Sequence, residues 1–179
     1  VANRFERLVA AVVTSLRHPK EEVSDAAFLA GALGKLWLAG ADADFSARYF
    51  HQATVFDGRL WIVGGEDDSG YGSDVWSSQD GVAWTQQTAN AGFSARVGHQ
   101  VTAFDGRLWV VGGRDGAGDT NDVWSSVDGI VWTLQTADAG FSIRNGHQLA
   151  AFDERLWVIG GSHDGDDTND IWSSEDGVT

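Results

Sequence analysis

A seven-residue motif occurs three times in this chain, and successive copies begin 48 residues apart. The copies are RLWIVGG from Arg59, RLWVVGG from Arg107 and RLWVIGG from Arg155. A period of this length is typical of architectures that stack one small unit repeatedly. The same spacing relates further positions, namely Phe45, Phe93 and Phe141, then His51, His99 and His147, and then Trp76, Trp124 and Trp172.

The middle copy contains signals for four strands joined by short turns. Asp105-Gly106 favours a type I′ hairpin turn, whose twist matches that of the flanking strands. The double glycine 112–113 is predicted to end the second strand, because glycine permits a bend or a close approach. A polar loop is expected next, and a turn at 127–129 separates the last two strands. The four predicted strands are 99–104, 107–111, 122–126 and 130–136.

Residues 108–111 are apolar on both alternating faces, so this sheet must be covered on both sides. Identical sheets stacked around an axis meet that need, and the result is a β-propeller. The double glycine, the Trp eleven or twelve residues later and the Arg-x-x-His before each unit resemble Kelch repeats from residue 41 to 179. The resemblance implies an all-β fold of Kelch-like four-stranded antiparallel meanders. The sequence departs from the pattern where Trp replaces the usual Tyr of the second strand, and where Glu154 replaces the turn glycine and predicts a different hairpin.

The segments SSQDGVAWT (77–85) and SSVDGIVWT (125–133) are similar to the Asp-box hairpins of sialidase-like propellers, although one residue between Asp and Gly is missing. The favoured interpretation is instead a tight turn in which Asp caps backbone amides and Trp packs between sheets.

The ends of the repeat array predict an incomplete ring, since propellers close with about four to eight blades. Residues 3–17 have the apolar spacing of an amphipathic helix, with eroded strands as the alternative. A strand at 35–39 could pair beside 170–174. Either two copies form a six-bladed ring, or the chain is a fragment of a longer propeller. The predicted parts are an N-terminal segment 1–34, a lone strand and loop 35–50, blades at 51–98 and 99–146, and a truncated blade at 147–179.

The composition excludes several classes of partner. A net charge of −14 disfavours nucleic acid, which is bound through clustered Lys and Arg. No apolar run reaches the roughly 18 residues of a membrane span, and the absence of cysteine excludes disulfides and thiolate metal sites. No cofactor or metal is predicted. Similar repeats are common in bacterial exported proteins, and this resemblance favours an exported or cell-surface location.

The repeated His and Arg residues are interpreted as structural, because an active site needs one constellation and these residues occur once per unit. Arg48, Arg96 and Arg144, together with the three histidines, are expected to form hydrogen bonds between neighbouring sheets. Their expected partners are Asp74, Asp122 and Asp170.

The segments that differ between copies predict the binding site, since loops on a rigid scaffold usually carry specificity. They are 66–73, 114–121 and 162–169, with the preceding positions 49–50 and their counterparts. The predicted site residues are Tyr49, Phe50, Tyr71, Arg114, His163 and Asp164.

The predicted function is non-catalytic binding of a protein or a glycan at this loop face. The alternative is a fragment of a larger propeller enzyme resembling galactose oxidase or a sialidase, which would require an unrepeated cluster of Tyr, His or Arg. A third possibility is a decayed reading frame without function. The acidic segment 163–170 could hold calcium, but it lacks the ligand spacing of an EF-hand, and turn-forming Asp and Asn are the favoured explanation.

Overall fold

The computed structural model describes residues 42–178, so the predicted helix at 3–17 and the predicted strand at 35–39 lie outside the described part. The described residues are all β, with twelve strands in three antiparallel sheets. Within the described residues, one compact unit contains 44–79 and 84–178.

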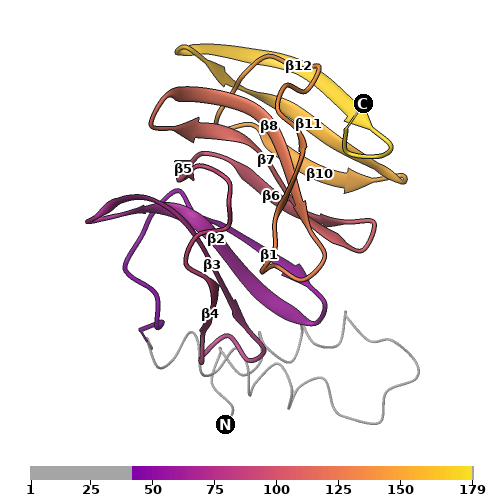
Figure 1. The fold of residues 1–179 in the computed structure, drawn as a ribbon. Helices are drawn as coiled ribbons and strands as arrows, with labels where there is room; N and C mark the ends of the chain where they lie inside the picture. Colours follow the sequence, from indigo (N-terminus) through magenta and orange to yellow (C-terminus); the bar gives the residue numbers. More distant parts are fainter. Residues whose placement is uncertain (1–41, 179) are drawn as a thin grey trace, which may run out of the picture. The chain divides into compact units, whose positions relative to one another are not determined.

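Each sheet corresponds to one copy of the repeat and forms one blade (Figure 1). The predicted meander is therefore confirmed, and the described residues form no closed ring. Blade 1 contains β1 (Gln52–Phe56), β2 (Arg59–Asp67), β3 (Gly70–Ser78) and β4 (Thr85–Thr88). Blade 2 contains β5 (Arg96–Val97), β6 (Gln100–Phe104), β7 (Arg107–Asp115), β8 (Gly118–Ser126) and β9 (Thr133–Thr136). Blade 3 contains β10 (Gln148–Phe152), β11 (Arg155–His163) and β12 (Asp166–Ser174).

The double glycine does not end the second strand, contrary to the prediction. In blade 2 the ladder between β7 and β8 shifts register between Val111 and Gly113 and then continues to Asp115. Gly113 has φ of 105°, and a Cβ there would lie 2.7 Å from the Cβ of His99. Glycine is needed for this close approach, and the bulge lets the strand continue past it. The predicted polar loops are consequently the tips of long hairpins.

The hairpin turn between the first two strands is the same in all three blades. Asp105 and Gly106 have φ values of 46° and 66°, as a type I′ turn requires. Asp153 and Glu154 have φ values of 52° and 57°. The expected different hairpin at Glu154 is therefore wrong, since the flanking strands impose the same left-handed geometry on a residue that disfavours it.

The hydrophobic core lies between successive blades. Val63 and Val75 of blade 1 pack with Leu108, Val110 and Trp132 of blade 2, and all five side chains are buried. Burial of each such side chain contributes about 1.5–3 kcal/mol. An equivalent cluster between blades 2 and 3 confirms that the sheets are stabilised by stacking.

The turn after the third strand is a tight Asp-capped turn, which confirms that alternative to an Asp-box. Asp128 Oδ1 accepts hydrogen bonds from the backbone N–H groups of Ile130 (2.8 Å) and Val131 (2.9 Å). This turn takes up the start of the predicted fourth strand, so β9 begins only at Thr133. Gly129 of the same turn packs on Trp61 of blade 1, where a Cβ would lie 2.0 Å from the indole ring.

Candidate binding face

The repeated arginines bind the predicted aspartates. In blade 2 the Arg96 guanidinium donates to both carboxylate oxygens of Asp122 at 2.6 and 2.8 Å. Trp124 Nε1 donates to the same carboxylate at 2.7 Å. Burial is the largest single influence and opposes ionisation of Asp122. The hydrogen bonds and charge of Arg96, with hydrogen bonds from Trp124 and Thr120, together outweigh burial and lower the pKa of this carboxyl. Arg96 pairs through β5 with the sheet that contains Asp122, so the ion pair lies within one sheet rather than between sheets as predicted. The equivalent pairs are Arg48–Asp74 and Arg144–Asp170.

The repeated histidines do not form the predicted side-chain hydrogen bonds. His99 and His147 are fully buried, and neither ring nitrogen of either residue has a hydrogen-bond partner of normal geometry. Burial, followed by the charge of Arg96, lowers the pKa of His99 to about 3, and the Val63 carbonyl opposes this only in part. Burial likewise lowers the pKa of His147 to about 4. These neutral rings fill space between blades and are inaccessible to a substrate.

The variable segments lie at one end of the blades. The β2–β3, β7–β8 and β11–β12 hairpin tips all lie on the left in Figure 1. The segment that leads into each blade pairs beside its tip, as shown by the hydrogen bonds between Tyr49 and Glu66 (3.0 and 2.9 Å) and between Asn145 and Ser162 (3.0 and 2.9 Å). We call this end the tip face. The six predicted site residues all lie at it, but the structure gathers them in two groups.

The first group lies on blade 1 and is aromatic. Tyr49 and Phe50 are 52% and 63% exposed, and their ring centroids are 5.0 Å apart. Glu66 is the cross-strand partner of both Tyr49 and Tyr71, so the three residues form a row on one face of the sheet. A hydrogen bond with Glu66 raises the pKa of Tyr49. Sequence reasoning missed Glu66, which only the strand register could have identified.

The second group connects the tips of blades 2 and 3 through Asp119. Arg114 donates to Asp119 Oδ1 at 3.1 Å, and Asn145 Nδ2 donates to the same oxygen at 2.9 Å. The backbone N–H of Asp164 donates to Asp119 Oδ2 at 3.3 Å, and His163 Nε2 lies 3.5 Å from the Asp164 carboxylate. Sequence reasoning missed Asp119 and Asn145, because their importance follows from contact between two blades.

This second group contains a possible set of metal ligands. Ligand atoms of Asp119, His163 and Asp164 lie within 4.8 Å of one another. The Arg114 guanidinium already binds one oxygen of Asp119, and a cation there would have to displace it. Segment 163–170 is mostly paired in β11 and β12 and does not wrap around a point as a calcium loop does. We therefore assign no ion to this group.

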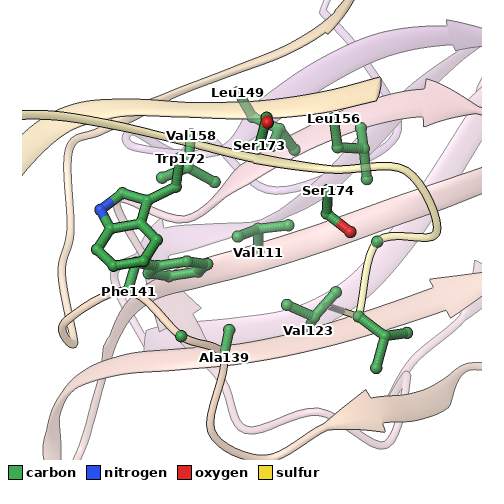
Figure 2. Close-up of a pocket in the computed structure, with 13 residues that line it drawn as sticks. Val111, Val123, Ala139, Phe141, Leu149, Leu156, Val158, Trp172, Ser173 and Ser174 are labelled. Atoms are coloured by element: carbon green, nitrogen blue, oxygen red, sulfur yellow. The ribbon is translucent and has the colours of Figure 1, made fainter. Parts of the chain in front are cut away.

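The outer face of blade 3 is apolar and exposed. Ile159 and Ile171 are 41% and 62% exposed, whereas their blade 2 counterparts Val111 and Val123 are 2% and 3% exposed. A separate cavity of about 330 Å³ lies between blades 2 and 3 and is lined mainly by apolar side chains, including Val123 and Leu156. Figure 2 shows this cavity with Trp172 and Phe141 at one end and Leu156 at the other.

Comparison with known protein families agrees with the blade geometry. The family model of the KLHDC2/KLHL20/DRC7 Kelch-repeats domain matches residues 38–175. The chain belongs to the Kelch-repeat family. Kelch-repeat domains are propeller modules for protein interaction, and the family is generally non-catalytic. A search of curated proteins found no match to it. Within residues 42–178 there is no helix of the length and apolarity that a membrane span requires.

Proposed function

We propose that the tip face of this Kelch-repeat protein binds a protein ligand without catalysing a reaction. The observation that carries the proposal is the pair of exposed rings of Tyr49 and Phe50. Aromatic residues bury much area at a low cost in conformational entropy, and Tyr is enriched among residues that dominate binding energy. The backbone hydrogen bonds between Tyr49 and Glu66 hold this pair on a sheet, so little ordering accompanies binding.

The second group supplies charge at the same tip face, on blades 2 and 3. The side chain of Arg114 is 50% exposed while its partner Asp119 is fully buried, so the guanidinium presents donors to a ligand from a fixed position. A central aromatic anchor with a charged neighbour is typical of protein interfaces. A glycan is the alternative ligand for the same face, and a protein is favoured because the exposed rings and Arg114 belong to different blades.

A propeller enzyme is the second candidate function. It would need an unrepeated cluster of Tyr, His or Arg. In the described residues these types are divided, since the tyrosines lie on blade 1 and Arg114 and His163 lie on blades 2 and 3. This division supports binding without turnover.

The test uses a partner captured by the full chain, which is then purified and titrated calorimetrically. The double change Tyr49→Ala and Phe50→Ala should weaken the affinity at least tenfold, since both rings would be lost. Phe152→Ala is the matched control, because Phe152 is 71% exposed at the opposite end of the blades. A partner that is insensitive to the double change but sensitive to Phe152→Ala would contradict the proposal.

We also propose that two copies stack head to tail into a six-bladed ring. At the interface between blades 1 and 2, Val63 and Val75 of blade 1 are buried against blade 2. Their counterparts on the outer face of blade 3 are Ile159 and Ile171, which are 41% and 62% exposed. The opposite face of blade 1 exposes Leu60 by 38%, whereas its counterpart Leu108 is completely buried. The two outer faces therefore carry complementary versions of an interface that already forms within the chain.

Light scattering of the full chain tests this assembly. We expect the mass of a dimer, and Ile171→Lys on the outer face of blade 3 should convert it to a monomer. Val127→Lys is the control, since Val127 is 59% exposed in a turn. A monomer at all concentrations, or a dimer that survives Ile171→Lys, would refute the head-to-tail arrangement.

A further inference from the structure

A polar pocket opens on blade 1 beside the tip face, and we call it the blade 1 pocket. Its volume is about 290 Å³, close to the lower limit of about 300 Å³ for small-molecule sites. Its lining includes the polar side chains of Arg48, Asp67, Ser69, Tyr71, Gln86 and Asn90.

The pocket exists because Gly72 stands where the other blades have threonine. In blade 2, Thr120 Oγ1 donates to the Gly113 carbonyl at 3.3 Å and accepts from Arg96 at 3.4 Å, so this side chain fills the space. Thr168 makes the same contacts in blade 3. A Cβ on Gly72 would approach only the end of the Asp74 side chain, at 2.9 Å, and Gly72 has no positive φ. The backbone therefore does not require glycine at this position.

The next position enlarges the same space. In blade 2, Asn121 Nδ2 donates to Asp138 and to the carbonyls of Ala139 and Phe141, at 2.7, 3.0 and 2.8 Å. Blade 1 has the shorter Ser73 there, and its hydroxyl donates to Asn90 Oδ1 at 3.3 Å.

A third position changes the chemistry of the lining. The counterpart of Leu134 in blade 2 is Gln86, which lines the pocket. The side chains of Thr120, Asn121 and Leu134 are thus replaced in blade 1 by Gly72, by Ser73 and by a polar amide. These three differences open a cavity and make it polar.

A preceding blade would not cover this pocket. The Asp74 carboxylate at its base is 16% exposed, and its counterpart Asp122 is 17% exposed although blade 1 is stacked against blade 2. Solvent therefore reaches this carboxylate position equally well whether or not a preceding blade is stacked against the sheet.

The charges of the pocket exclude an anion. Arg48 donates to both oxygens of Asp74 at 2.7 and 2.9 Å, so its charge is already neutralised. Asp67 forms no ion pair among the described residues and accepts hydrogen bonds from Ser46 and from the hydroxyl and N–H of Ser69. A carboxylate without a paired cation repels negative ligands and accepts hydrogen bonds from neutral donors.

The lining combines donors and acceptors, as a ligand with hydroxyl groups requires. The Gln86 amide offers both functions, and Asn90 Nδ2 offers donors. The hydroxyls of Ser69 and Ser73 donate to Asp67 and Asn90 and therefore offer acceptor lone pairs. A cationic ligand would need acceptors only. Tyr71 lines the same pocket and is 38% exposed, which gives a partly apolar surface for the C–H face of a ring.

We propose that the blade 1 pocket binds one neutral sugar unit of a glycan. This inference deepens the proposed binding function, since Tyr71 belongs both to the tip face and to the pocket. It does not depend on the protein ligand, because Tyr49, Phe50 and Glu66 do not line the pocket and its other lining side chains lie outside the aromatic group.

Saturation-transfer NMR of the full chain with a panel of methyl glycosides tests the proposal. The panel contains the glucoside, galactoside, mannoside and N-acetylglucosaminide, and at least one should bind at millimolar concentration. Gly72→Thr should weaken that binding at least tenfold, because it restores the side chain that fills blades 2 and 3. The fold of this variant is checked by its amide NMR spectrum.

The controls separate this proposal from the proposed protein binding. Tyr49→Ala, which removes part of the tip face, should leave glycoside binding within twofold of the original chain. Binding of butylammonium that is lost in Gly72→Thr, without glycoside binding, would reassign the pocket to cations and overturn the proposal. Absence of binding by all four glycosides, or glycoside binding that survives Gly72→Thr, would overturn it as well.

Discussion

Acid should weaken the stacking of the blades through the two buried histidines. His99 and His147 have pKa values of about 3 and about 4 in the folded chain, whereas an unfolded histidine titrates near 6.5. The unfolded chain therefore binds more protons below pH 6.5, and stability falls as the pH decreases from 6.5 toward 4. At pH 5 each histidine lowers the free energy of unfolding by about 2 kcal/mol, which follows from about 1.4 kcal/mol per pKa unit. The two together give a loss of about 4 kcal/mol between pH 7 and pH 5.

Urea denaturation at several pH values measures this loss. The double change His99→Leu and His147→Leu should remove most of the pH dependence between 7 and 5, and each single change should remove about half. Leucine is tolerable there because the ring nitrogens have no hydrogen-bond partners to lose. His163→Gln is the control, since His163 lies at an exposed tip. Asp122 cannot produce the effect, because its lowered pKa places its contribution below about pH 4. An unchanged slope in the double variant would refute the argument.

Three other changes probe the blade geometry by urea denaturation. Glu154→Gly should raise the free energy of unfolding by up to about 1 kcal/mol, because Glu154 has φ of 57° in a turn that suits glycine; a loss of stability would contradict this. Gly129→Ala should cost about 3 kcal/mol, since its Cβ would overlap the ring of Trp61, and a neutral effect would show that this contact does not form. Arg96→Met should cost about 3–5 kcal/mol by leaving the Asp122 carboxylate without its partner, whereas a loss below 1 kcal/mol would assign the pair no role in stability.

The repeat predicted the fold because the residues that recur in every copy are those that make the same contacts in every blade. A side chain such as Val63 is buried only when the next sheet covers it, so apolar residues on both faces of one strand already imply stacking. The Arg96–Asp122 pair was predictable for the same reason. The continuation of β7 beyond Gly113 was not predictable. A double glycine usually indicates the end of a strand, but here a β-bulge lets the strand continue past it.

The candidate site was predicted only in part. Tyr49 and Tyr71 were found because they differ between copies, but their grouping around Glu66 depends on strand register, which the sequence does not state. Asp119 was missed because its partners Asn145 and Asp164 come from the next blade. Contacts between units depend on how the units pack, so the pattern within one unit cannot reveal them.

A residue that differs in one copy of the repeat is not needed for the fold that all copies share, so it is a candidate for function. Gly72, which stands where the other copies have threonine, allows this argument to be tested. Glycine in a strand costs about 0.5–1 kcal/mol relative to alanine because the unfolded chain gains freedom, and Gly72 also lacks the hydrogen bonds that Thr120 makes. Gly72→Thr should therefore raise the free energy of unfolding by at least about 0.5 kcal/mol while it abolishes binding in the blade 1 pocket. Thr120→Gly in blade 2 is the matched control and should destabilise by a similar amount without affecting glycoside binding. If Gly72→Thr destabilised the chain, then the glycine would make room for the Asp74 carboxylate, which lies 2.9 Å from the position of a Cβ, and the pocket would be a consequence of packing rather than a site.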